Sequence, residues 1–208
     1  MAGFVERHVI NVLLGQSVDD RWRTLRFKAP IYAWRLGMRH LLPQVFACIT
    51  TRGRKTGMPR YTMVEHFVYG NRIYIASGFR DEPDWVQNLL DDPTVTLQPA
   101  HGEPIKGRAE RVQGEDDLQQ AYQAMRVSPI WVPWLMSLDI KPKVEDFIAK
   151  RERVYLFTIQ VGGAQPIAPG RELPALEDDL RWVSRSAMLG MTLGLALRWR
   201  QVRRKHQA

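Results

Sequence analysis

The sequence has very little cysteine. Cys48 is the only one among 208 residues, and it lies in the apolar run VFACIT. A single thiol excludes an internal disulfide and a zinc site built on paired cysteines, and it gives no sign of an oxidising compartment. We therefore expect Cys48 to be a buried structural residue of a protein in a reduced cytoplasm.

The motifs of common hydrolytic and metal-dependent enzymes are also missing. The chain has no HExxH sequence, no nucleophile elbow and no internal repeat. The N-terminal stretch MAGFVERHVINVLLG is too short and too charged for a spanning helix, and it lacks the basic start and the cleavage site of a signal peptide. We expect no metal site, and no catalytic residue is singled out by the sequence.

Acidic residues are scarcer than basic ones. There are 22 Asp and Glu against 30 Lys and Arg, which gives a net charge of +8. This charge favours anionic partners such as phosphate groups, acidic lipids or nucleic acid. No recognition helix or base-stacking motif accompanies the charge, so a nucleic-acid partner is not expected. The length and the hydrophobic content of 45% are ordinary for one well-filled domain.

Three segments follow one another along the chain. Residues 1–44 show helical spacing, with two or three helices interrupted at Gly15 and Pro30. Residues 45–161 contain about six short runs rich in β-branched and aromatic residues, separated by glycine turns around one inserted helix. Helices are absent between most of the strands, which argues against a parallel α/β sheet. We predict an α+β fold, a small barrel of mostly antiparallel strands with flanking helices.

The third segment, residues 162–208, is a Gly- and Pro-rich linker followed by a helix over 180–205. The uncharged run AMLGMTLGLAL is shorter than the roughly 20 residues that a spanning helix needs. Tryptophans flank this run and a basic cluster follows it, a pattern typical of an amphipathic helix on an anionic membrane surface. The spacing of Gly190 and Gly194 would let another helix approach closely, as in a homodimer, but this motif is weak by itself, and packing of the tail on its own domain is an equal alternative.

The densest positive charge lies in the segment TTRGRKTGMPR, residues 50–60, where one strand ends and the next begins. Its glycines let the backbone approach a ligand, Arg54 and Lys55 neutralise negative charge, and Thr56 adds a hydroxyl. This is the chemistry of a phosphate cradle. The Walker spacing is missing and no helix follows. A charged hairpin without a specific ligand is an equal alternative at this point.

The same segment is followed, in order, by IYIASGF, PDWVQNLLDDPTVTLQ and KGRAERV. This arrangement resembles the deazaflavin-dependent nitroreductase and quinone reductase family of the split β-barrel flavin-binding superfamily, over roughly residues 45–161. The resemblance implies an FMN-binding-like split β-barrel that binds coenzyme F-420, an 8-hydroxy-5-deazaflavin with a phosphate and an acidic glutamyl tail. FMN is the less expected cofactor.

The resemblance also implies which residues hold the cofactor. Arg54 and Lys55 match contacts to the phosphate and the tail, and Trp85 and Asn88 match the wall beside the ring. Met63 departs from the family, since many relatives have proline there. A plain core aromatic and a helix-surface amide are the alternatives for Trp85 and Asn88. The expected cofactor residues are Arg52, Arg54, Lys55, Thr56, Arg60, Met63, Ala76, Ser77, Gly78, Trp85 and Asn88.

The function implied is hydride transfer from reduced F-420 to a hydrophobic acceptor such as a quinone, a nitro compound or an unsaturated lipid. The acceptor is expected beside the aromatic stretch SPIWVPWLM, with plain core packing as the alternative for its tryptophans. Glu65 and His66 are neighbours on a strand, so at most one faces inward. The expected acceptor residues are Tyr122, Ser128, Trp131 and Trp134.

The expected location is the cytoplasm, with peripheral attachment to the inner face of the cell membrane. Two other functions fit the same residues. One is a non-catalytic protein that binds a flavin, a deazaflavin or a fatty acyl group at the membrane surface. The other is an FMN-dependent oxidoreductase on the same scaffold.

Overall fold

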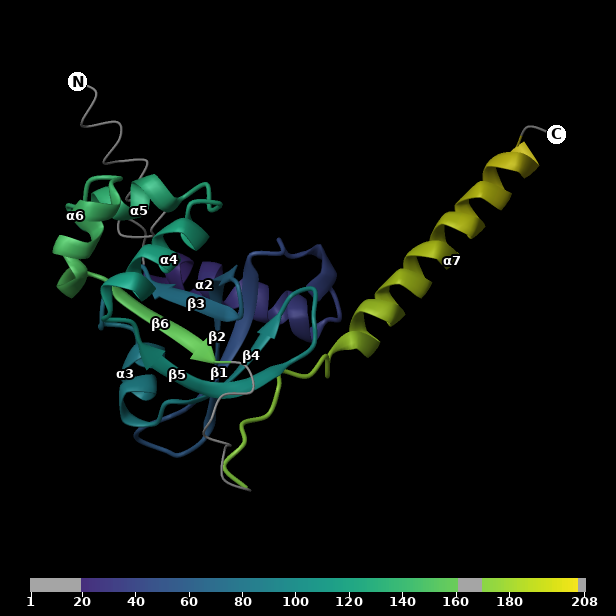
Figure 1. Cartoon of the computed structure of the whole chain (residues 1–208). Coiled ribbons are helices and arrows are strands. Elements are labelled where there is room, and N and C mark those ends of the chain that lie inside the picture. The colour runs from purple at the N-terminus through teal and green to yellow at the C-terminus, as the bar shows by residue number, and fades with distance from the viewer. Residues whose placement is uncertain (1–19, 161–169, 206–208) are drawn as a thin grey trace.

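The computed structural model describes residues 20–160 and 170–205. Figure 1 shows a barrel of strands with helices around it and one long helix projecting away. The strands close in the order β1-β2-β3-β6-β5-β4, and all neighbouring pairs are antiparallel. The predicted α+β barrel is therefore confirmed. The strands are β1 (Phe46–Arg52), β2 (Pro59–Tyr69), β3 (Arg72–Ser77), β4 (Thr94–Pro99), β5 (Ile105–Arg111) and β6 (Tyr155–Gln160).

The barrel interior is filled by one side of each strand. Alternate residues of a strand point to opposite faces, and inward-pointing Ile49 and Ile75 are completely buried. Helix α3 (Asp84–Asp91) packs on this interior cluster through Trp85, whose ring meets Phe157 edge-on with centroids 5.9 Å apart. Helix α3 is therefore held to the barrel core.

Helix α2 (Asp20–Arg35) packs against β2 on the outside of the barrel. Trp34 is buried against Cys48, and burial raises the pKa of the Cys48 thiol to about 12, as expected of a structural cysteine. The helix break predicted at Pro30 is wrong, because α2 continues through it. A proline removes one backbone hydrogen bond, and the packing of the last turn of α2 keeps the helix together. The break expected at Gly15 lies outside the described residues.

Helices α4 (Glu115–Met125), α5 (Trp131–Ser137) and α6 (Val144–Ala149) cover another side of the barrel (Figure 1). They surround a core of aromatic side chains. Their packing buries Tyr74 and Phe67 on the outer faces of β3 and β2. Short 3-10 turns follow α2 and precede β6. These turns are η1 (Arg39–Leu41) and η2 (Arg151–Arg153).

Residues 170–180, which we call the strap, run along the barrel beside β4. Leu173 and Leu176 are buried. The Thr96 hydroxyl donates to Leu173 O at 2.7 Å, and Leu176 N donates to Gln98 Oε1 at 3.0 Å. The described part of the predicted linker is therefore packed against the barrel by specific contacts, and the remainder of that linker lies outside the described residues.

The strap leads into α7 (Arg181–Lys205), a helix of 25 residues that points away from the barrel in Figure 1. The predicted C-terminal helix is thus present with nearly the expected bounds. Among the described residues, none of the helices combines the length and the apolar character needed to cross a membrane.

Candidate active site

The turn between β1 and β2 is held by its own backbone. Gly53 N donates to Met58 O at 2.9 Å, and Gly57 N donates to Gly53 O at 2.7 Å. Gly57 has a φ of +68°, a left-handed conformation that residues with a side chain adopt only under strain. The turn therefore presents Arg54 and Lys55 at its exposed tip.

Asn88 of α3 ties this turn to the barrel. Its side chain is only 3% exposed. Asn88 Oδ1 accepts hydrogen bonds from Arg54 N at 3.1 Å and from Arg54 Nη1 at 3.3 Å, and Nδ2 donates to Thr51 Oγ1 at 3.1 Å. Both ends of the amide are engaged, so Asn88 positions the basic turn and is not a helix-surface amide.

A cavity of about 830 Å³ opens beside the turn, and we call it the basic cavity. Helix α2, the turn, the start of β2 and α3 form its walls. Six of the eleven expected cofactor residues line it. The lining residues are Lys28, Ile31, Tyr32, Arg35, Gly53, Arg54, Lys55, Thr56, Pro59, Arg60, Tyr61, Thr62, Asp84, Trp85 and Asn88.

The basic cavity is strongly positive. Five of its lining residues are Lys or Arg, and the one acidic residue among them is Asp84. Arg54 Nη1 donates to Asp84 Oδ1 at 2.8 Å. Within residues 28–160 and 170–195, no carboxylate lies within salt-bridge distance of Lys28, Lys55 or Arg60. The surplus charge therefore favours an anionic ligand.

Sequence reasoning missed the wall that α2 contributes. Lys28, Ile31, Tyr32 and Arg35 follow the i, i+3, i+4, i+7 spacing of a single helix face. The spacing itself was available in the sequence. What the sequence did not show is that this face lines the same cavity as α3, because that placement depends on long-range packing.

Two expected cofactor residues are used elsewhere in the structure. Arg52 does not line the basic cavity, because its Nε donates to Asp92 Oδ2 at 3.1 Å and its Nη2 donates to Arg171 O at 3.0 Å. Met63 packs beside Trp34 under α2. Arg52 thus joins the barrel to the strap and Met63 belongs to the packing under α2, and a contact of either residue with the cofactor stays a prediction.

The expected residues at the end of β3 do not line the basic cavity either. Ser77 is 2% exposed, and its Oγ accepts a hydrogen bond from Phe79 N at 3.2 Å. Ala76 packs against the aromatic core. Gly78 adjoins the Trp134 ring, which a Cβ at this position would meet at 4.0 Å. Ser77 is thus buried, whereas Ala76 and Gly78 are partly exposed beside the aromatic core, and the expected contact of these three residues with the cofactor ring stays a prediction.

The aromatic residues expected at the acceptor form a packed core. Tyr122, Trp131 and Trp134 are each at most 7% exposed. The Tyr122 and Trp131 rings lie 5.1 Å apart, and Tyr122 also meets Phe147 at 5.5 Å. None of them lines the basic cavity. Their burial supports core packing, the stated alternative for the tryptophans, and their role at the acceptor stays a prediction.

Ser128, the remaining acceptor residue, lies against Glu65. Its hydroxyl donates to Glu65 Oε2 at 3.1 Å, and neither residue lines the basic cavity. Burial raises the pKa of Glu65, although the Ser128 hydrogen bond opposes that shift. The neighbouring His66 ring Nδ1 lies 2.9 Å from Val45 O, and burial lowers its pKa. The buried side chains of Glu65 and His66 therefore make the stability of the fold depend on pH.

We expect Glu65→Gln to stabilise the protein at neutral pH. The folded-state pKa of Glu65 lies above its unfolded value, so stability is greatest below the unfolded value and falls as pH rises through the folded pKa. The amide has no such penalty and still accepts the Ser128 hydrogen bond. Urea unfolding at pH 7 and pH 4 measures this, with the advantage of the variant expected to vanish at pH 4. An advantage of equal size at both pH values would contradict it.

Comparisons with known proteins were made against families, curated proteins and solved structures. The family model described as F-420H2-dependent quinone reductase matches residues 26–132, just over half of the chain. None of the curated proteins compared with the chain matches it.

Several solved structures are similar to the chain. One is described as an F-420-H2 dependent reductase (FDR-A), with 19% identity over 57% of this chain and 96% of that one, and a TM-score of 0.42. A structure described as a domain-swapped dimer has 19% identity over 58% of this chain and 84% of that one, with a TM-score of 0.43. A putative 5-nitroimidazole antibiotic resistance protein from Bacteroides thetaiotaomicron has 12% identity over 70% and 81%, with a TM-score of 0.43.

Proposed function

The chain belongs to the F-420H2-dependent quinone reductase family and is an F-420-dependent reductase, and we propose that its electron acceptor is an apolar quinone. The observation that carries the assignment of the site is the basic cavity. It combines a backbone-held turn, a surplus of cationic side chains and a volume in the range of cofactor sites.

The residues of the basic cavity fit the anionic end of F-420. Arg54, Lys55 and Thr56 supply two cations and a hydroxyl at one turn, which suits a phosphate. Lys28 of α2 and Arg60 of β2 add charge that suits the acidic glutamyl tail. These residues bind and orient the cofactor and take no part in the chemistry itself.

The apolar residues of the basic cavity suit the other end of the cofactor. Bound deazaflavin supplies the hydride, so the protein has to align the ring with the acceptor and exclude water. Trp85 of α3 and Ile31 of α2 both line the basic cavity and offer apolar surface beside the charged turn. We assign them to the ring side of the site.

We expect the protein to oxidise reduced F-420 when menadione, a quinone, is added without oxygen. Regeneration of oxidised cofactor is followed by the rise of its absorbance near ~420 nm. A nitro compound and an unsaturated lipid, tested in parallel, rank the acceptor classes. Binding of F-420 with no oxidation by menadione above the protein-free rate would reject the quinone as acceptor while leaving the cofactor site intact.

We also propose that the reductase works in the cytoplasm, at the inner face of the cell membrane as a peripheral protein. Apolar quinones partition into bilayers, so an enzyme at the surface meets a higher concentration of acceptor. The net charge of +8 supports attraction to anionic lipid.

A further inference from the structure

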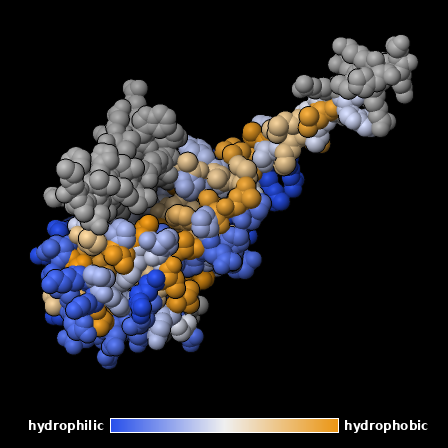
Figure 2. Space-filling view, turned by 90° about the horizontal axis from the view of Figure 1, so that it is seen from above, coloured by the Kyte–Doolittle hydropathy of each residue, from blue (hydrophilic) through white to orange (hydrophobic). Residues whose placement is uncertain are grey.

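Helix α7 exposes apolar side chains along its length. Figure 2 shows hydrophobic residues on the arm that projects from the body of the molecule. Leu189 is 71% exposed, Leu193 is 63% exposed and Leu195 is 68% exposed. Large contiguous apolar surfaces of this kind mark sites of interaction with a protein or a membrane.

The apolar residues surround the helix and do not form one stripe. Leu189 and Met191 are two positions apart, so they point to nearly opposite sides of a helix with 3.6 residues per turn, and both are more than 60% exposed. The same holds for Leu193 and Leu195. The amphipathic helix that we expected is therefore corrected to a helix that is apolar on all sides between its charged ends.

The root of α7 is fixed to the end of α2 by polar contacts. Arg35 Nε donates to Asp179 Oδ1 at 2.7 Å, Leu180 N donates to Arg35 O at 2.9 Å, and the Ser184 hydroxyl donates to Leu36 O at 2.8 Å. These contacts hold α7 to the end of α2, so the direction of the arm is set by the fold.

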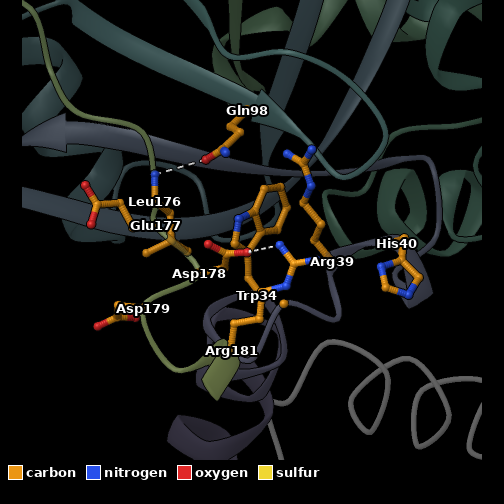
Figure 3. Close-up of a pocket in the computed structure, with 10 residues that line it drawn as sticks. Trp34, Arg39, His40, Gln98, Leu176, Glu177, Asp178, Asp179 and Arg181 are labelled. Atoms are coloured by element: carbon orange, nitrogen blue, oxygen red, sulfur yellow. Dashed lines mark hydrogen bonds and ion pairs between the residues drawn. The ribbon is translucent and has the colours of Figure 1, made fainter. Parts of the chain in front are cut away.

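Figure 3 shows the hollow of about 520 Å³ between the strap, α2 and the root of α7. Arg181 Nη1 donates to Asp178 Oδ2 at 3.2 Å there, and the Arg39 guanidinium lies over the Trp34 ring at 5.8 Å. Gly37 approaches the Arg181 side chain so closely that a Cβ would meet it at 2.9 Å. The hollow is thus bordered by specific contacts at the root of α7, and the apolar arm projects beyond it (Figure 1).

We propose that α7 inserts into the headgroup and upper acyl region of an anionic membrane. Residues 198–205 carry five Lys and Arg, which complement anionic lipid, and Trp182 and Trp199 flank the apolar run at the level expected for interfacial tryptophans. A second copy paired along α7 would cover only one side of each helix, and in a parallel pair it would bring the two basic clusters together. Anionic lipid around the inserted helix covers all sides of the apolar run and neutralises the charge of residues 198–205.

The test is flotation of the full chain with vesicles. We expect it to float with an equal mixture of phosphatidylglycerol and phosphatidylcholine and to bind pure phosphatidylcholine much more weakly. Leu193→Glu is expected to weaken binding by about tenfold, because an apolar side chain no longer enters the lipid. Val68→Glu, at an exposed valine of β2, is the matched control and is expected to bind like the wild type.

The double variant Arg203→Gln and Arg204→Gln is expected to weaken binding to the anionic vesicles by about tenfold and to leave the weak binding to neutral vesicles unchanged. Equal binding of the wild type to both vesicle types, or binding of Leu193→Glu as tight as that of the wild type, overturns the proposal. So does light scattering that shows a dimer which Leu193→Glu converts to a monomer while flotation is unchanged. Menadione reduction in solution tests the proposed function separately.

Discussion

Replacing Lys55 with glutamate is expected to weaken F-420 binding by about 100-fold, which corresponds to roughly 2.7 kcal/mol. The change reverses a charge at the tip of the basic turn, so two units of charge act on the phosphate end of the cofactor. Lys55 is exposed, lines the basic cavity and has no carboxylate partner within the described part of the chain, so its charge is available to a ligand. Titration of F-420 followed by absorbance measures the affinity.

Lys143→Glu is the matched control for this experiment. Lys143 is exposed at the start of α6 and does not line the basic cavity. Its replacement by glutamate changes the net charge of the protein by the same amount as Lys55→Glu. The affinity of the Lys143→Glu variant for F-420 is expected to stay within about threefold of that of the wild type, because the changed charge is exposed and lies outside the site. Similar affinities for Lys55→Glu and Lys143→Glu would show that only net charge matters and would reject the turn as the phosphate site.

Asn88→Ala is expected to cost about 2–3 kcal/mol of stability. The buried amide accepts from Arg54 N and donates to Thr51, and its loss leaves both groups without their partner. For a chain of this size the melting temperature should fall by about 5–10 °C. F-420 affinity should fall as well, because Arg54 N would no longer be held and the basic turn would lose its position.

Asn88→Asp separates the two roles of the amide. A carboxylate still accepts from Arg54 N, and the Thr51 hydroxyl can reverse its hydrogen bond and donate. Stability should therefore fall much less than in Asn88→Ala, while the new negative charge in the basic cavity lowers F-420 affinity. Calorimetry together with cofactor titration measures both quantities. An Asn88→Ala variant as stable as the wild type would contradict the positioning role.

The barrel was predictable because its signals are local. Alternating β-branched and aromatic runs, glycine turns and the helix around Trp85 each follow from a short stretch of sequence, and the order of the strands along the chain limits how they can pair. The basic turn was predictable for the same reason, since Arg54, Lys55 and Thr56 are consecutive.

The rest of the site depends on contacts between distant segments. Lys28 and Arg35 reach the basic cavity because α2 packs against β2. Arg52 does not line the cavity, because Asp92 and the strap both accept hydrogen bonds from its guanidinium. The sequence left two roles open for Trp131, because an aromatic run fits a core and a binding wall equally well, and the structure places Trp131 in the aromatic core. Composition cannot separate these cases without the packing.

The most direct test of the account is titration of the purified protein with F-420 and, separately, with FMN. The basic cavity is expected to bind F-420 at micromolar concentration, to bind FMN more weakly because it lacks the glutamyl tail, and to lose affinity for F-420 as salt is raised. Absence of F-420 binding at micromolar concentration, or tighter binding of FMN than of F-420, would contradict the account.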